Sequence, residues 1–160
     1  MEEIKRMQEN LLLIRRTVGW SAAEFGERIG VTRQTISNIE NGRNKLNKTQ
    51  YIAMRSVLDA EIESCPTDTE MLKILLDVLI DNPDNYSEEM RKELADKANL
   101  MVPGILVGSA TREKVSKEWM IVAATVAGAT LFPPSVAVLG AVSVSAWLRK
   151  LTKKNKKTKE

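Results

Sequence analysis

Histidine is absent from this 160-residue sequence, and cysteine occurs once, at Cys65. Without histidine, the chain lacks the usual general base near neutral pH and the commonest zinc ligand. A single cysteine cannot form a disulfide within one chain. We therefore expect no catalytic centre, no metal site and no cofactor, and we predict that the protein is not an enzyme.

Aromatic residues are also scarce, at 4% of the sequence. The core must then be built from leucine, isoleucine, valine and methionine, as in many helical proteins. Because apolar residues recur at steps of three and four along successive segments, we predict an all-α fold. No signal peptide precedes the charged opening MEEIKRMQEN, so we expect a protein of the reducing cytoplasm.

The net charge of +3 is divided unevenly along the chain. Residues 1–63 carry +1, residues 64–118 carry −4 and residues 119–160 carry +6. Most of the positive excess lies in the terminal segment RKLTKKNKKTKE. The overall charge therefore says little about partners, and a nucleic-acid-binding surface has to come from the local placement of basic side chains.

Apolar spacing and helix-end signals together predict a series of short helices joined by tight turns. Ser21 with Glu24 matches the capping-box pattern, and so does Thr67 with Glu70. The predicted ranges are 4–18, 21–29, 32–40, 49–62, 70–80 and 87–101, and a further helix starts near Thr111.

The predicted helix at 70–80, EMLKILLDVLI, is apolar on most of its circumference. A helix with one solvent-exposed face needs less apolar surface than this. The surplus either covers other helices of the same chain or packs against a second copy. We expect a homodimer formed through residues 67–101. The residues expected in this contact are Leu72, Leu75, Leu76 and Leu79.

Tight connections follow one another in GWSAAEFGERIGVTRQTISNIENGR, residues 19–43. Gly26 has no side chain to hold two helices apart, and Gly30 can adopt the positive φ of a turn. Ile36 and Ile39 would face the core. The segment resembles the helix-turn-helix of the Xre/Cro family, which includes the lambdoid phage repressors. The resemblance, over about residues 4–63, implies a five-helix repressor-like domain that binds double-stranded DNA.

The second helix of the motif carries the DNA contacts that this resemblance implies. In such motifs, the N-terminal half of that helix enters the major groove. Arginine can bond to both O6 and N7 of guanine, and glutamine or asparagine can bond to N6 and N7 of adenine. We therefore predict Arg33, Gln34 and Asn38 as the base-reading residues.

Further polar residues around this helix are expected to contact the DNA backbone or to add to the readout. The predicted set is Thr32, Thr35, Ser37, Asn41, Arg43, Lys45 and Lys48. The resemblance also implies a structural pair between Arg15 and Glu40. One position departs from the family, since Ala22 stands where a phosphate-contacting glutamine is often found. Other groups must replace that contact, or binding is weaker.

Residues 119–148 contain no charged side chain. A single transmembrane helix is disfavoured because Pro133 and Pro134 interrupt it and because the lysine-rich tail would cross the membrane against the positive-inside rule. Two alternatives remain for a helical hairpin with arms 119–131 and 135–148. In the first, the hairpin contacts membrane lipid. In the second, the protein is soluble and the hairpin is buried against a protein partner or against the rest of the chain.

In the membrane alternative, both ends of the hairpin lie on the same side of the membrane. Trp119 and Trp147 would come together at the open end, where a membrane interface suits their amphipathic rings. The basic tail could then hold anionic lipid headgroups. In this version the protein lies at the inner face of the cell membrane.

These patterns divide the chain into four parts. They are an Xre-type helix-turn-helix domain at 1–65, an acidic helical dimerisation or linker section at 66–110, the apolar hairpin at 111–151 and a basic tail at 152–160. We predict a sequence-specific transcriptional regulator, acting as a homodimeric repressor. The alternative is a membrane-associated interaction or immunity-type protein whose helix-turn-helix binds a protein or only controls its own gene.

Overall fold

The computed structural model describes residues 1–103 and 111–126 of the chain. Within these ranges all regular secondary structure is helical, which confirms the all-α class. The α-helices are α1 (Glu2–Val18), α2 (Ala22–Ile29), α3 (Arg33–Glu40), α4 (Lys48–Ser64), α5 (Glu70–Leu76), α6 (Glu88–Met101) and α8 (Arg112–Val126). Helix α5 continues into a π-helical turn at Asp77–Asp81, and a 3-10 turn at Pro83–Asn85 follows.

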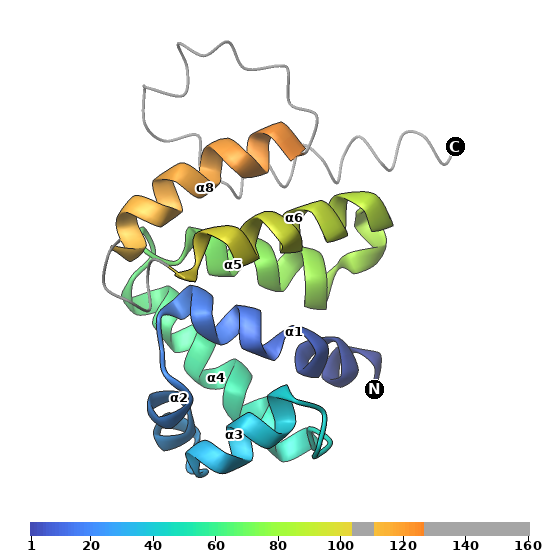
Figure 1. Cartoon of the computed structure of the whole chain (residues 1–160), viewed down its shortest axis with the longest axis vertical. Coiled ribbons are helices and arrows are strands. Elements are labelled where there is room, and N and C mark those ends of the chain that lie inside the picture. Colours follow the sequence, from blue (N-terminus) through green and yellow to red (C-terminus); the bar gives the residue numbers. More distant parts are fainter. Residues whose placement is uncertain (104–110, 127–160) are drawn as a thin grey trace.

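Helix α1 runs through the middle of the molecule, between two groups of helices (Figure 1). Helices α2, α3 and α4 lie on one side of it, and α5, α6 and α8 lie on the other. Members of both groups contact α1 directly. As a result, α3 and α8 lie toward opposite ends of the molecule (Figure 1).

Local capping bonds set two helix starts where the sequence indicates them. The Ser87 hydroxyl accepts a hydrogen bond from the Met90 amide at 3.2 Å, at the start of α6. The Thr111 hydroxyl accepts one from the Lys114 amide at 3.2 Å, at the start of α8. The predicted starts of these helices are confirmed.

The predicted capping box of Thr67 and Glu70 is wrong. Residues 66–69 form a turn, and α5 begins only after Thr69, which makes no side-chain capping bond. The buried Thr69 hydroxyl instead donates to the Cys65 carbonyl at 2.7 Å. It therefore satisfies a carbonyl beyond the end of α4 and not an amide at the start of α5.

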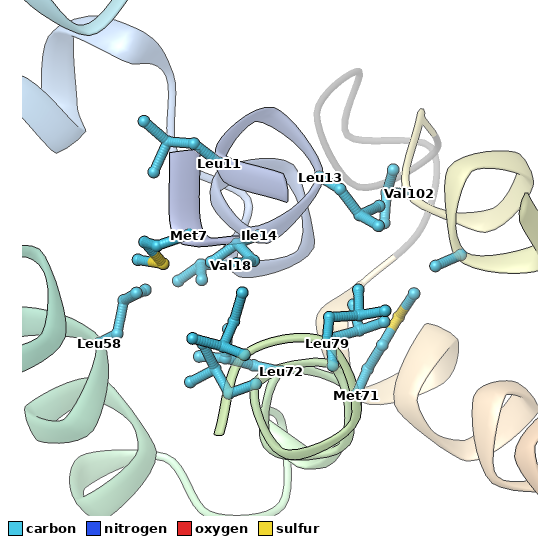
Figure 2. Packing of buried hydrophobic residues seen from close by; sticks show 14 of the residues in the cluster. Met7, Leu11, Leu13, Ile14, Val18, Leu58, Met71, Leu72, Leu79 and Val102 are labelled. Carbon is cyan, nitrogen blue, oxygen red and sulfur yellow. The ribbon is translucent and has the colours of Figure 1, made fainter. Parts of the chain in front are cut away.

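A single hydrophobic cluster connects both groups of helices through α1. Figure 2 shows Met7 of α1 facing Leu58 of α4. Leu72 of α5 and Leu79 of the π-helical turn lie between α1 and their own helix (Figure 2). The cluster continues as far as Trp119 of α8. The boundaries expected after residues 65 and 110 therefore do not separate independent cores.

The four leucines expected at a dimer interface belong to this core. Their side chains lie inside one chain, where they pack with α1 and the other helices of the cluster. The exposed fractions are 1% for Leu72, 0% for Leu75, 2% for Leu76 and 8% for Leu79. They offer no surface to a second copy, and their assignment to dimerisation has to be corrected. The apolar circumference of this helix covers its own chain on more than one side.

Polar contacts hold the π-helical turn against its neighbours. The guanidinium of Arg6 donates to the Ile80 carbonyl through Nε at 3.1 Å and Nη2 at 2.9 Å. This carbonyl lies in the last turn of the helix, where carbonyls lack helical partners. The Tyr86 hydroxyl donates to Asp77 at 2.5 Å, and burial, together with this carboxylate, raises the pKa of Tyr86.

Arg112 joins the start of α8 to the N-terminal half of the chain. Its Nη1 donates to the Val18 carbonyl at 3.2 Å and to the Glu61 carboxylate at 2.5 Å. The hydroxyl of Ser116, one turn further along α8, donates to the Asp68 carbonyl at 3.0 Å. Through these bonds α8 is attached to the end of α1 and to α4.

The apolar stretch that begins at Trp119 falls only partly within the described residues. Its first residues are the second half of α8, so the first hairpin arm does not begin at Trp119 but continues a helix that starts at Arg112. The Trp119 side chain is 0% exposed and packs in the protein core, which does not fit the membrane-interface position expected for it. The turn, the second arm with Trp147 and the tail lie outside the described residues.

Within residues 1–103 and 111–126, no helix is both long and apolar enough to cross a bilayer.

Arg112→Ala should lower the free energy of unfolding by about 1 to 3 kcal/mol, because it leaves the half-buried Glu61 carboxylate and the Val18 carbonyl without this partner. Thermal unfolding followed by circular dichroism measures the change. Lys117→Ala is the matched control, since its bond to Glu113 has the same length on the same helix but its side chain is 70% exposed. Equal melting temperatures for the two variants would contradict the role given to Arg112.

Candidate nucleic-acid interface

Helix α2 begins with the capping box that the sequence predicts. The Glu24 amide donates to the Ser21 hydroxyl at 3.1 Å, and the Ser21 amide donates to the Glu24 carboxylate at 2.7 Å. Hydrogen bonds from the backbone and side chain of Ser21 lower the pKa of Glu24. A lowered pKa means that the cap adds stability above the unfolded-state pKa of a glutamate and loses it as the pH falls through the folded-state value.

The turn between α2 and α3 depends on two glycines, as predicted. A Cβ atom on Gly26 would lie 2.6 Å from the carbonyl oxygen of Val31, so any larger residue would push α2 away from the start of α3. The Val31 amide closes the turn by donating to the Gly26 carbonyl at 2.8 Å. Gly30 has a φ of 74°, in the left-handed region that glycine adopts without strain. Both predictions are confirmed.

The orientation of α3 is fixed by what it buries. Its two isoleucines, Ile36 and Ile39, are 0% exposed. At its start, the Thr32 hydroxyl accepts a bond from the Thr35 amide at 3.1 Å, which caps the helix. With one face in the core, the opposite face of α3 must point to solvent.

Arg15 and Glu40 come together beneath α3, as the family resemblance implied. The guanidinium donates to both carboxylate oxygens, through Nε at 2.5 Å and Nη2 at 3.1 Å. Its remaining nitrogen, Nη1, donates to the Trp20 carbonyl at 2.7 Å. Since both side chains are less than a tenth exposed, this bidentate pair links α1, the end of α3 and the connection to α2 in one buried unit.

The Trp20 side chain is a further part of this region that sequence reasoning missed. Its ring stacks on that of Phe25, with centroids 5.8 Å apart, and the Arg28 guanidinium lies 4.2 Å from its centroid. This packing fixes the connection between α1 and α2. An aromatic residue directly before the Ser21 cap is the only signal in the sequence that could have indicated it.

The three predicted base-reading residues lie on the outward face of α3. Arg33 and Gln34 are exposed, and Asn38 is half-buried. Gln34 Nε2 donates to Asn38 Oδ1 at 2.9 Å, so these two side chains form one unit. This bond leaves Gln34 Oε1 as an acceptor and Asn38 Nδ2 as a donor toward solvent.

The residues predicted to contact phosphate divide into two groups. Arg43, Lys45 and Lys48 are exposed in the loop after α3 and at the start of α4. Asn41, in contrast, directs its side-chain nitrogen at Ser37, with distances of 2.7 Å to the carbonyl and 3.3 Å to the hydroxyl. In the free protein this amide ends α3, and the exposed basic residues carry the positive charge.

The remaining three predicted contacts, Thr32, Thr35 and Ser37, lie on or beside the same face of α3. The Thr32 and Thr35 hydroxyls are 3.0 Å apart, and Ser37 is half-buried. In the part of the chain that the structure describes, no group of three or more histidine, cysteine or acidic residues could hold a metal ion. The predicted contact residues themselves carry hydrogen-bonding or cationic side chains.

Comparison with known proteins identifies the class of this domain. The family model described as Helix-turn-helix, of the Xre/Cro-like type, matches residues 11–65. Searches among curated proteins and among solved structures gave no match. The N-terminal part of the chain is thus an Xre/Cro-like helix-turn-helix domain, the kind found in DNA-binding transcriptional regulators. The match ends before α5, so it covers none of α5, α6 or α8.

Replacing one member of the buried Arg15–Glu40 pair should destabilise the fold strongly. Arg15→Met leaves the Glu40 carboxylate buried without its cation. We expect the free energy of unfolding, measured by chemical denaturation, to fall by about 3 to 5 kcal/mol. The double variant Arg15→Met/Glu40→Met buries no charge and should be more stable than Arg15→Met. A double variant less stable than the single one would show that the pair does not behave as a coupled buried unit.

Proposed function

We propose that this protein is a sequence-specific DNA-binding repressor that acts as a homodimer and performs no chemistry on the DNA. The observation that carries the proposal is the outward face of α3, where Arg33 and the Gln34–Asn38 unit point to solvent. Ile36, Ile39 and the Arg15–Glu40 pair hold the helix from the other side. A rigid helix with exposed, multidentate polar side chains is what readout in the major groove requires.

The chemistry of this face favours particular bases. Arg33 is free to donate in parallel to O6 and N7 of a guanine. The bond within the Gln34–Asn38 unit leaves one acceptor, Gln34 Oε1, and one donor, Asn38 Nδ2, unused by each other. That arrangement complements adenine, whose N6 amino group donates and whose N7 accepts. The two amides are thus proposed to read one adenine together.

Affinity would come from the basic residues beside α3. Arg43, Lys45 and Lys48 are exposed and project from the segment that follows the recognition helix. Neutralising phosphates with such residues releases counterions and strengthens binding without regard to sequence. Thr32, Thr35 and Ser37 are proposed as additional hydrogen-bonding contacts at the groove edge.

The homodimer is proposed from the size of the recognition surface. One short helix contacts few base pairs, and proteins of this architecture gain affinity by binding two half-sites about 34 Å apart. The leucines of α5 cannot form the contact because they are buried. The dimer surface must therefore lie elsewhere, and occupancy of a promoter by the dimer would repress transcription.

Membrane association through residues 119–148 is the second candidate for the C-terminal part. The absence of charge along this stretch supports it, whereas the burial of Trp119 among core residues supports packing within protein. Because α8 is bonded to α1 and α4 through Arg112, we favour burial against protein.

Variants of the two kinds of DNA contact should differ in a measurable way. Once a bound site has been selected from a random-sequence library, Gln34→Ala should cost about 1 to 3 kcal/mol on that site and little on unrelated DNA. Asn38→Ala should lower the binding free energy for this site by less in the Gln34→Ala background than in the unmodified protein, since the two amides act together. Lys45→Ala should weaken binding to all sequences and lower the salt slope by about 1.

Fluorescence anisotropy with labelled duplexes gives these affinities. Glu63→Ala, a change on α4 away from the proposed interface, serves as the control. It should alter neither the affinity for the selected site nor the salt slope. If Arg33→Ala and Gln34→Ala retain full sequence selectivity, the base-reading assignment is wrong. If the unmodified protein shows no salt-dependent affinity for DNA, the proposed function is wrong.

Sedimentation and cell fractionation should separate the two proposals for assembly and location. We expect the full-length chain in the soluble fraction without detergent, sedimenting as a dimer. Recovery in the membrane fraction, with release only by detergent, would support lipid contact at 119–148 instead. A monomer that binds a single half-site would contradict the homodimer.

A further inference from the structure

The side-chain amide of Gln8, on α1, bonds to three backbone groups at once. Its Nε2 donates to the Ile39 carbonyl at 3.0 Å and to the Asn44 carbonyl at 2.7 Å. Its Oε1 accepts from the Leu46 amide at 2.9 Å. Both amide hydrogens and the carbonyl oxygen are therefore used, and no other uncharged side chain supplies two donors and an acceptor at this reach.

These bonds connect two ends of the loop between α3 and α4. Ile39 lies in the last turn of α3, whereas Leu46 lies just before the cap of α4. The other hydrogen bonds of this loop are local. The Arg43 and Asn44 amides both donate to the Asn38 carbonyl, and Asn47 caps α4 with Gln50. Within the described residues, Gln8 thus supplies the only polar contact between this loop and another part of the fold.

The loop carries two of the three basic residues proposed to contact phosphate. Arg43 and Lys45 are exposed, and neither forms an ion pair or a side-chain hydrogen bond in the described part of the chain. Their side chains are consequently not held in place by partners of their own. Where their charges lie relative to α3 is set by the backbone that Gln8 holds.

We propose that Gln8 is a positioning residue for DNA binding, which holds the loop at 41–47 so that Arg43 and Lys45 meet phosphates while α3 lies in the groove. This inference rests on the proposed function and adds a residue to it. Gln8 precedes the segment matched by the helix-turn-helix model, which starts at residue 11. Its role therefore comes from the three bonds and not from the family.

The test uses the full chain and the variant Gln8→Met, which keeps the length of the side chain but removes all three bonds. The probe is a fluorescein-labelled DNA duplex of mixed sequence, titrated between about 50 and 200 mM KCl, where phosphate contacts dominate affinity. If both cations move away from the phosphates, the slope of log affinity against log salt should fall by about 1 to 2. Affinity at low salt should fall about five- to ten-fold for each phosphate that is no longer neutralised.

Asn10→Ala is the matched control. The Asn10 amide donates only to the Arg6 carbonyl of its own helix, at 2.8 Å. Removing it should leave both the slope and the affinity unchanged. In a background that already carries Arg43→Ala and Lys45→Ala, Gln8→Met should have no further effect on the slope, because the groups that it positions are gone.

A Gln8→Met protein that melts at a lower temperature but keeps the full salt slope would overturn the proposal, since Gln8 would then serve stability alone. Should this variant fail to fold, amide hydrogen exchange in the unmodified chain decides the matter. The Leu46 amide must then be protected. Exchange at the rate of an open loop amide overturns the proposal. Absence of salt-dependent binding by the unmodified protein would instead overturn the proposed function.

Discussion

Enclosure of α1 on both sides is the constraint on which the rest of the structure depends. Because helices pack on two sides of α1, the long polar side chains that point toward them can avoid an unpaired burial only by bonding to other elements. Arg6 reaches the carbonyl at the end of the π-helical turn, Gln8 reaches the loop after α3, and Arg15 reaches Glu40 and the Trp20 carbonyl. The central helix therefore determines where the recognition helix and its loop are held.

Features encoded by neighbouring residues were predictable from the sequence. The cap formed by Ser21 and Glu24, the turn at Gly30 and the close contact at Gly26 each depend on residues within about one helical turn of each other. The inward positions of Ile36 and Ile39 follow from helical spacing alone. For this reason the motif and the outward face of α3 could be predicted before the structure was known.

Features that depend on distant contacts were not predictable in the same way. The apolar surplus of α5 was apparent from the sequence, but whether α1 or a second chain covers it depends on tertiary packing, and the choice of a second chain for Leu72 was wrong. The pattern marked Gln8 only as a polar residue between apolar ones, although it bonds to groups more than thirty residues away. Arg112 likewise reaches Val18 across 94 positions.

The structural unit that holds α3 extends beyond the helix-turn-helix motif, because α1 and α5 share one core. Leu72 and Leu79 lie between α1 and the helix formed by α5 and the π-helical turn (Figure 2), and burying one such side chain contributes about 1.5 to 3 kcal/mol. Since the net stability of a typical domain is only about 5 to 15 kcal/mol, losing one or two of these contacts would remove a large part of it. The packing of α5 on α1 therefore belongs to the same core that holds α3 in position, although the sequence motif ends before α5 begins.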